Sequence, residues 1–190
     1  MPPTTRDRIL DAFQDLLIDG GERAATLDAV SASAGVSKGG LLYHFASKDA
    51  LAAGLLDRLR DLAALDAEQI RTASSGAVDH LIRNSVDTGS PLDRSMIGAY
   101  RLAQGRHEGA KAAIAAVNAG WLEAIEDAVG DPAVAQLIML VSDGLYYNSA
   151  IADVGLDASV AVPTDLDALL AVISRLTPAP GTPSAQELPG

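Results

Sequence analysis

The sequence predicts an all-α protein of about nine helices, and three observations lead to this prediction. Alanine, the best helix former, accounts for 35 of the 190 residues. Apolar residues recur at the spacing of amphipathic helices along most of the chain. Runs of β-branched residues bounded by turn signals, which mark strands, are hard to find. With 48% hydrophobic and 21% charged residues, the composition is that of a globular chain with one medium domain or two small ones.

The helical periodicity divides the chain into nine segments. The first covers about residues 6–18, with Phe13 in its apolar stripe. Thr5 is its expected N-cap, and Gly20 with Gly21 is expected to end it. The other helices are expected near residues 27–34, 38–45, 49–71, 78–88, 92–104, 110–129, 132–153 and 166–176.

Residues 26–45 have the pattern of a helix, a short turn that contains glycine, and a second helix, which is a helix-turn-helix. The side chains expected to face inward are Leu27, Val30, Val36, Leu41 and Phe45. The opposite face of the second helix presents Ser37, Lys38, Gly39, Gly40, Tyr43 and His44. Each of its two glycines costs roughly 1 kcal/mol in helix propensity relative to alanine. This cost indicates close approach of the backbone to another surface, such as the edge of DNA.

The charge distribution is compatible with such a contact, although the formal net charge of the chain is −11. Residues 29–48 contain two lysines and one histidine but no acidic residue. Residues 1–60 carry seven basic and eight acidic side chains, a net charge of −1, so the remaining residues carry −10. The total charge disfavours non-specific binding to nucleic acid, but it leaves a local contact surface possible.

The segment from residue 26 to residue 51 resembles the DNA-binding segment of the tetracycline-repressor (TetR) family. The resemblance rests on Ala-Gly-Val-Ser at residues 34–37, Tyr-His-Phe at 43–45 and Ser-Lys-Asp-Ala-Leu at 47–51, and it covers about residues 6–60. It implies a cytoplasmic, homodimeric repressor that binds a palindromic operator and is released by a small apolar or amphipathic effector. Residues 1–48 would then form the DNA-binding domain, and residues 49–176 the ligand-binding and dimerisation domain. Residues 177–190, which hold four of the nine prolines, are expected to be a disordered tail.

The resemblance also implies roles for single residues. Phosphates would be contacted by Thr26, Ser37, Tyr43 and Lys48. The major-groove base edges would lie at or beside Lys38, Gly39, Gly40 and His44. Leu42 departs from many members of the family, which carry a tyrosine that reaches a phosphate at this position.

The second domain contains four of the seven aromatic residues. Tryptophan and tyrosine combine apolar area with a polar tip, as ligand pockets require, although aromatics at helical spacing also fill cores. The candidate ligand-binding residues are Met96, Tyr100, Gln104, Asn118, Trp121, Asp143, Tyr146, Tyr147, Asn148 and Ile151. The helices near residues 132–153 and 166–176 are expected to pair with their symmetry mates in a four-helix dimer interface. The apolar residues expected there are Val134, Leu137, Ile138, Val141, Leu145, Leu166, Leu169, Leu170 and Ile173.

Other function classes find little support in the sequence. There is no cysteine, no phosphate-binding glycine loop, no zinc-protease motif and no visible Ser-His-Asp arrangement, so no enzyme and no cofactor is predicted. The spacing of His80, His107 and Glu108 does not require a metal site. No apolar stretch is long enough for a membrane span, and the N-terminus lacks the apolar region of a signal peptide. The alternative is a helical dimer that binds a small molecule or another protein and does not act through DNA.

Overall fold

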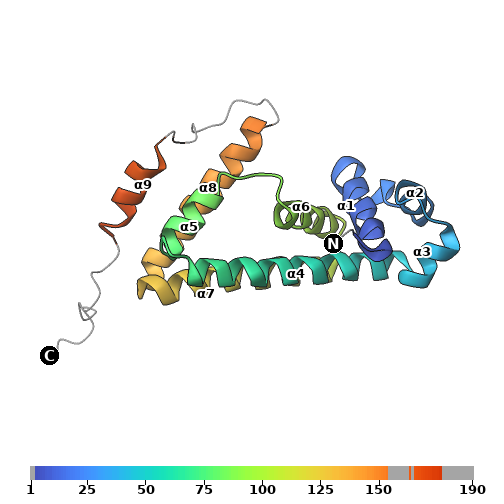
Figure 1. Cartoon of the computed structure of the whole chain (residues 1–190), viewed down its shortest axis with the longest axis horizontal. Helices are drawn as coiled ribbons and strands as arrows, with labels where there is room; N and C mark the ends of the chain where they lie inside the picture. The colour runs from blue at the N-terminus through green and yellow to red at the C-terminus, as the bar shows by residue number, and fades with distance from the viewer. Residues whose placement is uncertain (1–2, 154–162, 164, 177–190) are drawn as a thin grey trace. The chain divides into compact units, whose positions relative to one another are not determined.

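The computed structural model describes residues 3–153, 163 and 165–176, and within them it contains nine α-helices and no strand (Figure 1). The helices are α1 (Thr5–Ala24), α2 (Leu27–Ser33), α3 (Lys38–His44), α4 (Lys48–Thr72), α5 (Ala77–Asn84), α6 (Pro91–Gln104), α7 (Glu108–Val129), α8 (Pro132–Asp153) and α9 (Leu166–Ile173). The predicted all-α class and the number of helices are confirmed. The expected tail at residues 177–190 lies outside the described residues.

Helix α1 differs from its prediction at both ends. Thr4 and not Thr5 is the N-cap, because the Thr4 hydroxyl accepts a hydrogen bond from the Asp7 backbone N–H at 3.1 Å. The Asp7 carboxylate accepts in return from the Thr4 hydroxyl at 2.6 Å and from the Thr4 backbone N–H at 3.1 Å. These two bonds hold the pKa of Asp7 below its ordinary value, the hydroxyl contributing most. Gly21, with φ 68° and ψ −173°, kinks the helix instead of ending it, and the helix continues to Ala24.

The predicted helix-turn-helix is present as α2 and α3. Thr26 caps α2 and Ser37 caps α3, each through a side-chain oxygen that accepts a backbone N–H bond. The side chains expected to face inward are buried (Val30, Leu41 and Phe45) or half-buried (Leu27 and Val36). The packing of the two short helices therefore follows from the apolar pattern of the sequence.

The chain divides into two compact units. The first consists of Met1–Asp66 and Gly89–Ala119, and the second of Ala67–Thr88 together with the described residues from Gly120 onward. Helices α4 and α7 therefore contribute residues to both units. The predicted boundary at residue 48 divides the chain by function, into a DNA-binding and a ligand-binding domain, and it stays a prediction.

In the first unit, α1 packs against both α2 and α6. The large side chains that are fully buried there are Ile9, Leu10, Phe13, Leu17, Leu41, Leu51, Leu55, Leu59 and Leu102. Gly98 allows α6 to pack closely, because a Cβ atom at this position would lie 3.0 Å from Leu55 Cδ2 and 3.6 Å from Gln14 Cγ. This close approach fixes the spacing of α1, α4 and α6.

In the second unit, α5, α8 and α9 pack around one apolar cluster that includes Ile82, Ile125 and Leu145. Most of the residues predicted for the dimer interface belong to this cluster or pack against it: Val134, Ile138, Val141, Leu145, Leu166, Leu169, Leu170 and Ile173. An apolar pattern marks a face without saying what covers it, so the part that these residues play in a dimer interface stays a prediction. Of the predicted residues, Leu137 is exposed.

Candidate functional site

Helix α3 presents an exposed outer face that matches the predicted DNA-reading surface. Tyr43 is 86% exposed and Leu42 is 40% exposed, while Leu41, on the inner face of α3, is buried. The His44 ring lies edge-on to the Tyr43 ring, with centroids 5.2 Å apart. Lys38, Gly39 and His44 are also exposed, so the predicted surface residues of α3 lie together on a solvent-facing surface.

The two caps of the helix-turn-helix leave a donor available to a ligand. The Thr26 hydroxyl oxygen accepts from the Ala29 N–H at 3.2 Å, and the Ser37 oxygen accepts from the Gly40 N–H at 3.0 Å. A hydroxyl group that accepts a hydrogen bond still has its own proton to donate. Both side chains are thus suited to contact a phosphate while they cap their helices.

Both lysines of the predicted surface already have an acidic partner. Lys38 Nζ lies 2.8 Å from Asp28 Oδ1. Lys48 Nζ donates to the Glu22 backbone carbonyl at 2.5 Å and lies 3.7 Å from the Glu22 carboxylate. Asp28 stands one position before the acid-free stretch noted in the sequence, and the fold brings it onto Lys38. A phosphate must therefore share or replace these partners.

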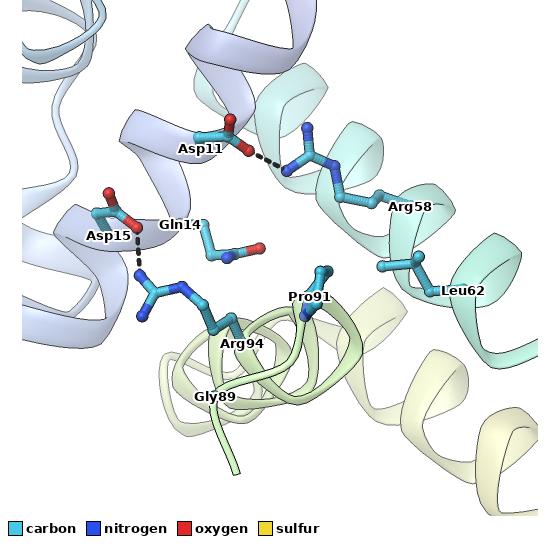
Figure 2. A pocket seen from close by; sticks show the side chains of 8 residues that line it. All are labelled: Asp11, Gln14, Asp15, Arg58, Leu62, Gly89, Pro91 and Arg94. Atoms are coloured by element: carbon cyan, nitrogen blue, oxygen red, sulfur yellow. Dashed lines mark hydrogen bonds and ion pairs between the residues drawn. The ribbon is translucent and has the colours of Figure 1, made fainter. Parts of the chain in front are cut away.

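A polar cavity of about 470 Å³ lies among α1, α4 and the start of α6 (Figure 2). Its lining comprises Asp11, Gln14 and Asp15 from α1, Arg58 and Leu62 from α4, and Gly89, Pro91 and Arg94 from the start of α6 and the residues before it. Arg58 Nη1 lies 2.6 Å from Asp11 Oδ1, and Arg94 Nη2 lies 2.5 Å from Asp15 Oδ1. The cavity therefore has one Asp–Arg ion pair on each side of Gln14, as Figure 2 shows.

Gln14 is the most buried polar residue of this cavity, with 5% of its surface exposed. Its Oε1 accepts from the Ser95 hydroxyl at 3.1 Å, and that hydroxyl also lies 2.8 Å from the Pro91 carbonyl oxygen. None of the cavity residues was predicted as a site residue from the sequence. The available signal was the spacing of Asp11 and Asp15, which places both carboxylates on one face of α1.

The ten candidate ligand-binding residues are distributed over α6, α7 and α8. The first unit contains Met96, Tyr100, Gln104 and Asn118, of which Met96 is buried and the others are exposed. The second contains Trp121, Asp143, Tyr146, Tyr147, Asn148 and Ile151. The Ile151 side chain lies outside the described part of α8. None of the ten lines the cavity among α1, α4 and α6, and their role in binding stays a prediction.

Three of these residues in the second unit have informative surroundings. Trp121 is half-buried, and its indole Nε1 is enclosed without a hydrogen-bond acceptor among the described residues. Asn148 Nδ2 donates to the Gly144 carbonyl at 2.7 Å. Partial desolvation raises the pKa of the Asp143 carboxyl, although the residue lies on the exposed face of α8.

The histidines outside α3 do not gather with other metal-binding side chains. His80 Nε2 lies 2.9 Å from Asn84 Nδ2, and His107 Nδ1 is buried without a partner among the residues described. Over the same residues, no group of three or more His, Asp or Glu side chains is arranged to hold a metal ion. Nor does the described part of the chain contain a helix that is long and apolar enough to cross a membrane.

Comparisons with known proteins agree with the helix-turn-helix geometry. Residues 9–55 match the family described as bacterial regulatory proteins, tetR family. A search of curated proteins found no match. Among solved structures, a TetR-family member from Streptomyces coelicolor A3 superposes with a TM-score of 0.64 at 23% identity, covering 93% of this chain and 100% of that one. Salmonella enterica GusR superposes with a TM-score of 0.66 at 18% identity, covering 93% and 96%.

A third similar structure is that of the multidrug binding protein EbrR complexed with malachite green. Its TM-score is 0.65 at 21% identity, with 93% of this chain and 100% of that chain covered. At these identities the structural likeness establishes the fold alone, and the sequence match to the family covers residues 9–55. Residues 9–55 are therefore similar to the bacterial regulatory proteins of the tetR family, and the chain has the fold of the solved structures named above.

Proposed function

We propose that the protein is a dimeric transcriptional repressor that binds a palindromic or nearly palindromic DNA operator and is released by a small apolar or amphipathic effector. The observation that carries this proposal is the outer face of α3, which exposes Tyr43, His44 and Lys38 next to two helix caps with available hydroxyl groups. The family match over the same helices supports it. Such a repressor acts on DNA in the cytoplasm and needs no catalytic group and no cofactor.

The proposed contacts to DNA divide into two groups. Lys38, Gly39, Gly40 and His44 lie at or beside the base edges, and Thr26, Ser37, Tyr43 and Lys48 contact phosphates. The base-edge group lies on α3, which enters the major groove. The residues proposed to contact phosphates lie at the starts of α2 and α4, at the cap of α3 and at Tyr43. All of them are exposed or half-buried.

The uncovered apolar face of α8 supports dimerisation. Leu137, Leu140 and Tyr147 are 43%, 64% and 60% exposed, and with Gly144 they are spaced by three, four and three residues along one face. This spacing is that of helices that pair along a seam. Val172 on α9 is also exposed. We assign the dimer interface to these outer faces of α8 and α9. A dimer that binds two half-sites one turn of DNA apart needs its two reading helices about 34–36 Å apart.

The effector is proposed to act by lowering the affinity for DNA. A typical coupling of about 1–3 kcal/mol weakens binding about 5- to 150-fold. The ten predicted residues of α6, α7 and α8 are the candidates for contact with this effector. Since EbrR was crystallised with malachite green and with ethidium, aromatic cations of this kind are the first compounds to screen.

The test is a selection of binding sites from random-sequence DNA, followed by fluorescence anisotropy on the selected site. We expect a palindromic or nearly palindromic site and an affinity that falls with salt concentration. Lys38→Ala should weaken binding, whereas Lys111→Ala should not. The two lysines are matched, since they are 56% and 57% exposed and each lies beside one carboxylate, but Lys111 is on α7. Equal binding by the two variants would show that α3 is not the reading helix.

A second candidate function is a helical dimer that senses a small molecule without binding DNA. The observation in its favour is that both lysines of the proposed interface are neutralised by Asp28 and Glu22. A selection that recovers no palindrome, combined with saturable binding of a dye, would favour this second function.

A further inference from the structure

We propose that the cavity among α1, α4 and α6 binds a small zwitterion of the α-amino acid class. The cavity contains two aspartates and two arginines, so the charges of its lining sum to zero. Its volume of about 470 Å³ is in the range of small-molecule sites, which is about 300–1,000 Å³. Figure 2 shows that both signs of charge are present on either side of Gln14.

The carboxylates of the cavity have acceptor capacity for an ammonium group. Each ion pair uses one oxygen, since Arg58 Nη1 donates to Asp11 Oδ1 and Arg94 Nη2 contacts Asp15 Oδ1. The Oδ2 atoms of Asp11 and Asp15 accept no hydrogen bond from the described residues. The two aspartates are four residues apart on α1 and therefore point to the same side of the helix. An ammonium group can thus bind to this pair while both ion pairs persist.

The cavity has donor capacity for a carboxylate as well. Arg94 uses only Nη2 in its contact with Asp15, so Nε and Nη1 remain for an anion within the part of the chain described. Gln14 accepts from Ser95 through Oε1, which leaves its NH₂ group as a donor between the two ion pairs. Arg58 is less available, because it also donates to the Asp7 carbonyl at 3.3 Å.

The apolar lining indicates what joins the two charged groups of the ligand. Leu62 and Pro91 supply the apolar side chains of the cavity, which suits an aliphatic side chain on the ligand. A purely cationic or anionic ligand would leave one set of these partners unused and bring a net charge into a site that is balanced. A zwitterion satisfies both sets without this cost.

Binding in this cavity connects α1 of the helix-turn-helix region to α6. A ligand that favours one arrangement of these helices therefore changes the affinity for DNA, and this regulatory consequence rests on the proposed function. The existence of the site does not rest on it, since binding can be measured in the absence of DNA.

The experiment is isothermal titration calorimetry of the full chain with L-leucine and with the two compounds that each lack one of its charged groups. These are 3-methylbutylamine, which keeps the ammonium group, and 4-methylpentanoate, which keeps the carboxylate. We expect saturable binding of leucine at one site per chain and at least about tenfold weaker binding of the other two, because each loses a charged hydrogen-bonding group. Equal binding of the amine or of the acid would overturn the assignment to a zwitterion.

The variants Asp15→Asn and Arg94→Gln should each weaken leucine binding about tenfold or more. Asp57→Asn is the matched control, since Asp57 forms an exposed ion pair with Arg60 at 2.8 Å and does not line the cavity. Exposed ion pairs contribute little to folding, and thermal unfolding of each variant checks that it is folded. No leucine binding to the unaltered chain, or equal binding by the cavity variants and the control, would refute the site. A failure to bind DNA would refute only the proposed function.

Discussion

Gly39 gives a sharp test of the proposed contact between α3 and DNA. It is the second residue of α3, and a Cβ atom built on it meets no other atom within 4 Å. Its neighbour Gly40 has an internal reason to lack a side chain, because a Cβ there would lie 3.3 Å from Ser37 Oγ. The packing of the chain on itself therefore accounts for Gly40 but not for Gly39. The proposed function explains Gly39 by a surface that approaches from outside, which is DNA.

The expected effects of Gly39→Ala on folding and on binding have opposite signs. Since the methyl group meets nothing within the protein, the variant should be as stable as the parent or gain up to about 1 kcal/mol from helix propensity. In the complex with DNA, the same methyl group enters a close contact, at an overpacking cost of about 1–3 kcal/mol. The affinity for the selected DNA site should then fall about 5- to 150-fold.

Thermal unfolding and fluorescence anisotropy measure the two effects separately. Gly120→Ala is the matched control, because Gly120 lies within α7 and a Cβ there also meets nothing within 4 Å. The control should be no less stable and should bind DNA as the parent does. If Gly39→Ala binds DNA with unchanged affinity, the backbone of α3 does not approach the base edges and the proposed docking is wrong.

Three further predictions test the reading surface, the dimer and the first helix cap. Asp28→Asn releases Lys38 from its partner at 2.8 Å, so DNA binding should strengthen at low salt in the anisotropy assay, and an unchanged affinity would contradict this. Leu140→Glu puts a charge on the exposed face of α8 and should give monomers in sedimentation, whereas a persistent dimer would place the interface elsewhere. The Thr4 hydrogen bonds lower the pKa of Asp7 below 3.8, so the unfolded state binds protons more readily. The free energy of unfolding of the parent should therefore exceed that of Asp7→Asn by a constant amount above about pH 4, and this difference should decline as the pH falls through the lowered pKa of Asp7. A difference that does not depend on pH would exclude the Asp7 carboxylate as its cause.

The fold was predictable from the sequence because its signals are local. Thr26 and Ser37 have the residue type and position of helix caps, which the sequence alone displays, since a cap depends on residues three or four positions away. Leu41 and Phe45 were placed in the core by their spacing. The assignment of the cap of α1 to Thr5 failed because Thr4 and Thr5 are adjacent and both suit the position. Only the reciprocal hydrogen bonds between Thr4 and Asp7 distinguish them.

The polar contacts that define the candidate sites were not predictable in the same way. The Arg58–Asp11 pair joins residues 47 positions apart, and the Arg94–Asp15 pair joins residues 79 apart. Helical spacing says nothing about such partners, because they are set by how α1, α4 and α6 pack. The outer face of α8 shows the same limit. Its apolar pattern covers more than one side of the helix, so Leu140 could not be separated from Ile138 before the packing was known.

The contacts between α1 and its neighbours also bear on how the signal of the proposed effector would reach the helix-turn-helix. Arg58 holds Asp11, Arg94 holds Asp15, and Arg101 donates to the Ile18 carbonyl at 3.3 Å. Exposed ion pairs contribute about 0.2–1 kcal/mol each, so a few such contacts together approach the 1–3 kcal/mol that allosteric coupling typically requires.

These contacts are partly exposed to solvent, and salt screens exposed charges over a Debye length that shortens from about 10 Å at 0.1 M to about 3 Å at 1 M. If they transmit the signal, the ratio of DNA affinities without and with an effector should shrink as salt rises over this range. This ratio cancels the general effect of salt on DNA binding, because both affinities contain it. A ratio that does not change with salt would assign the coupling to the apolar packing of α1 on α6 instead.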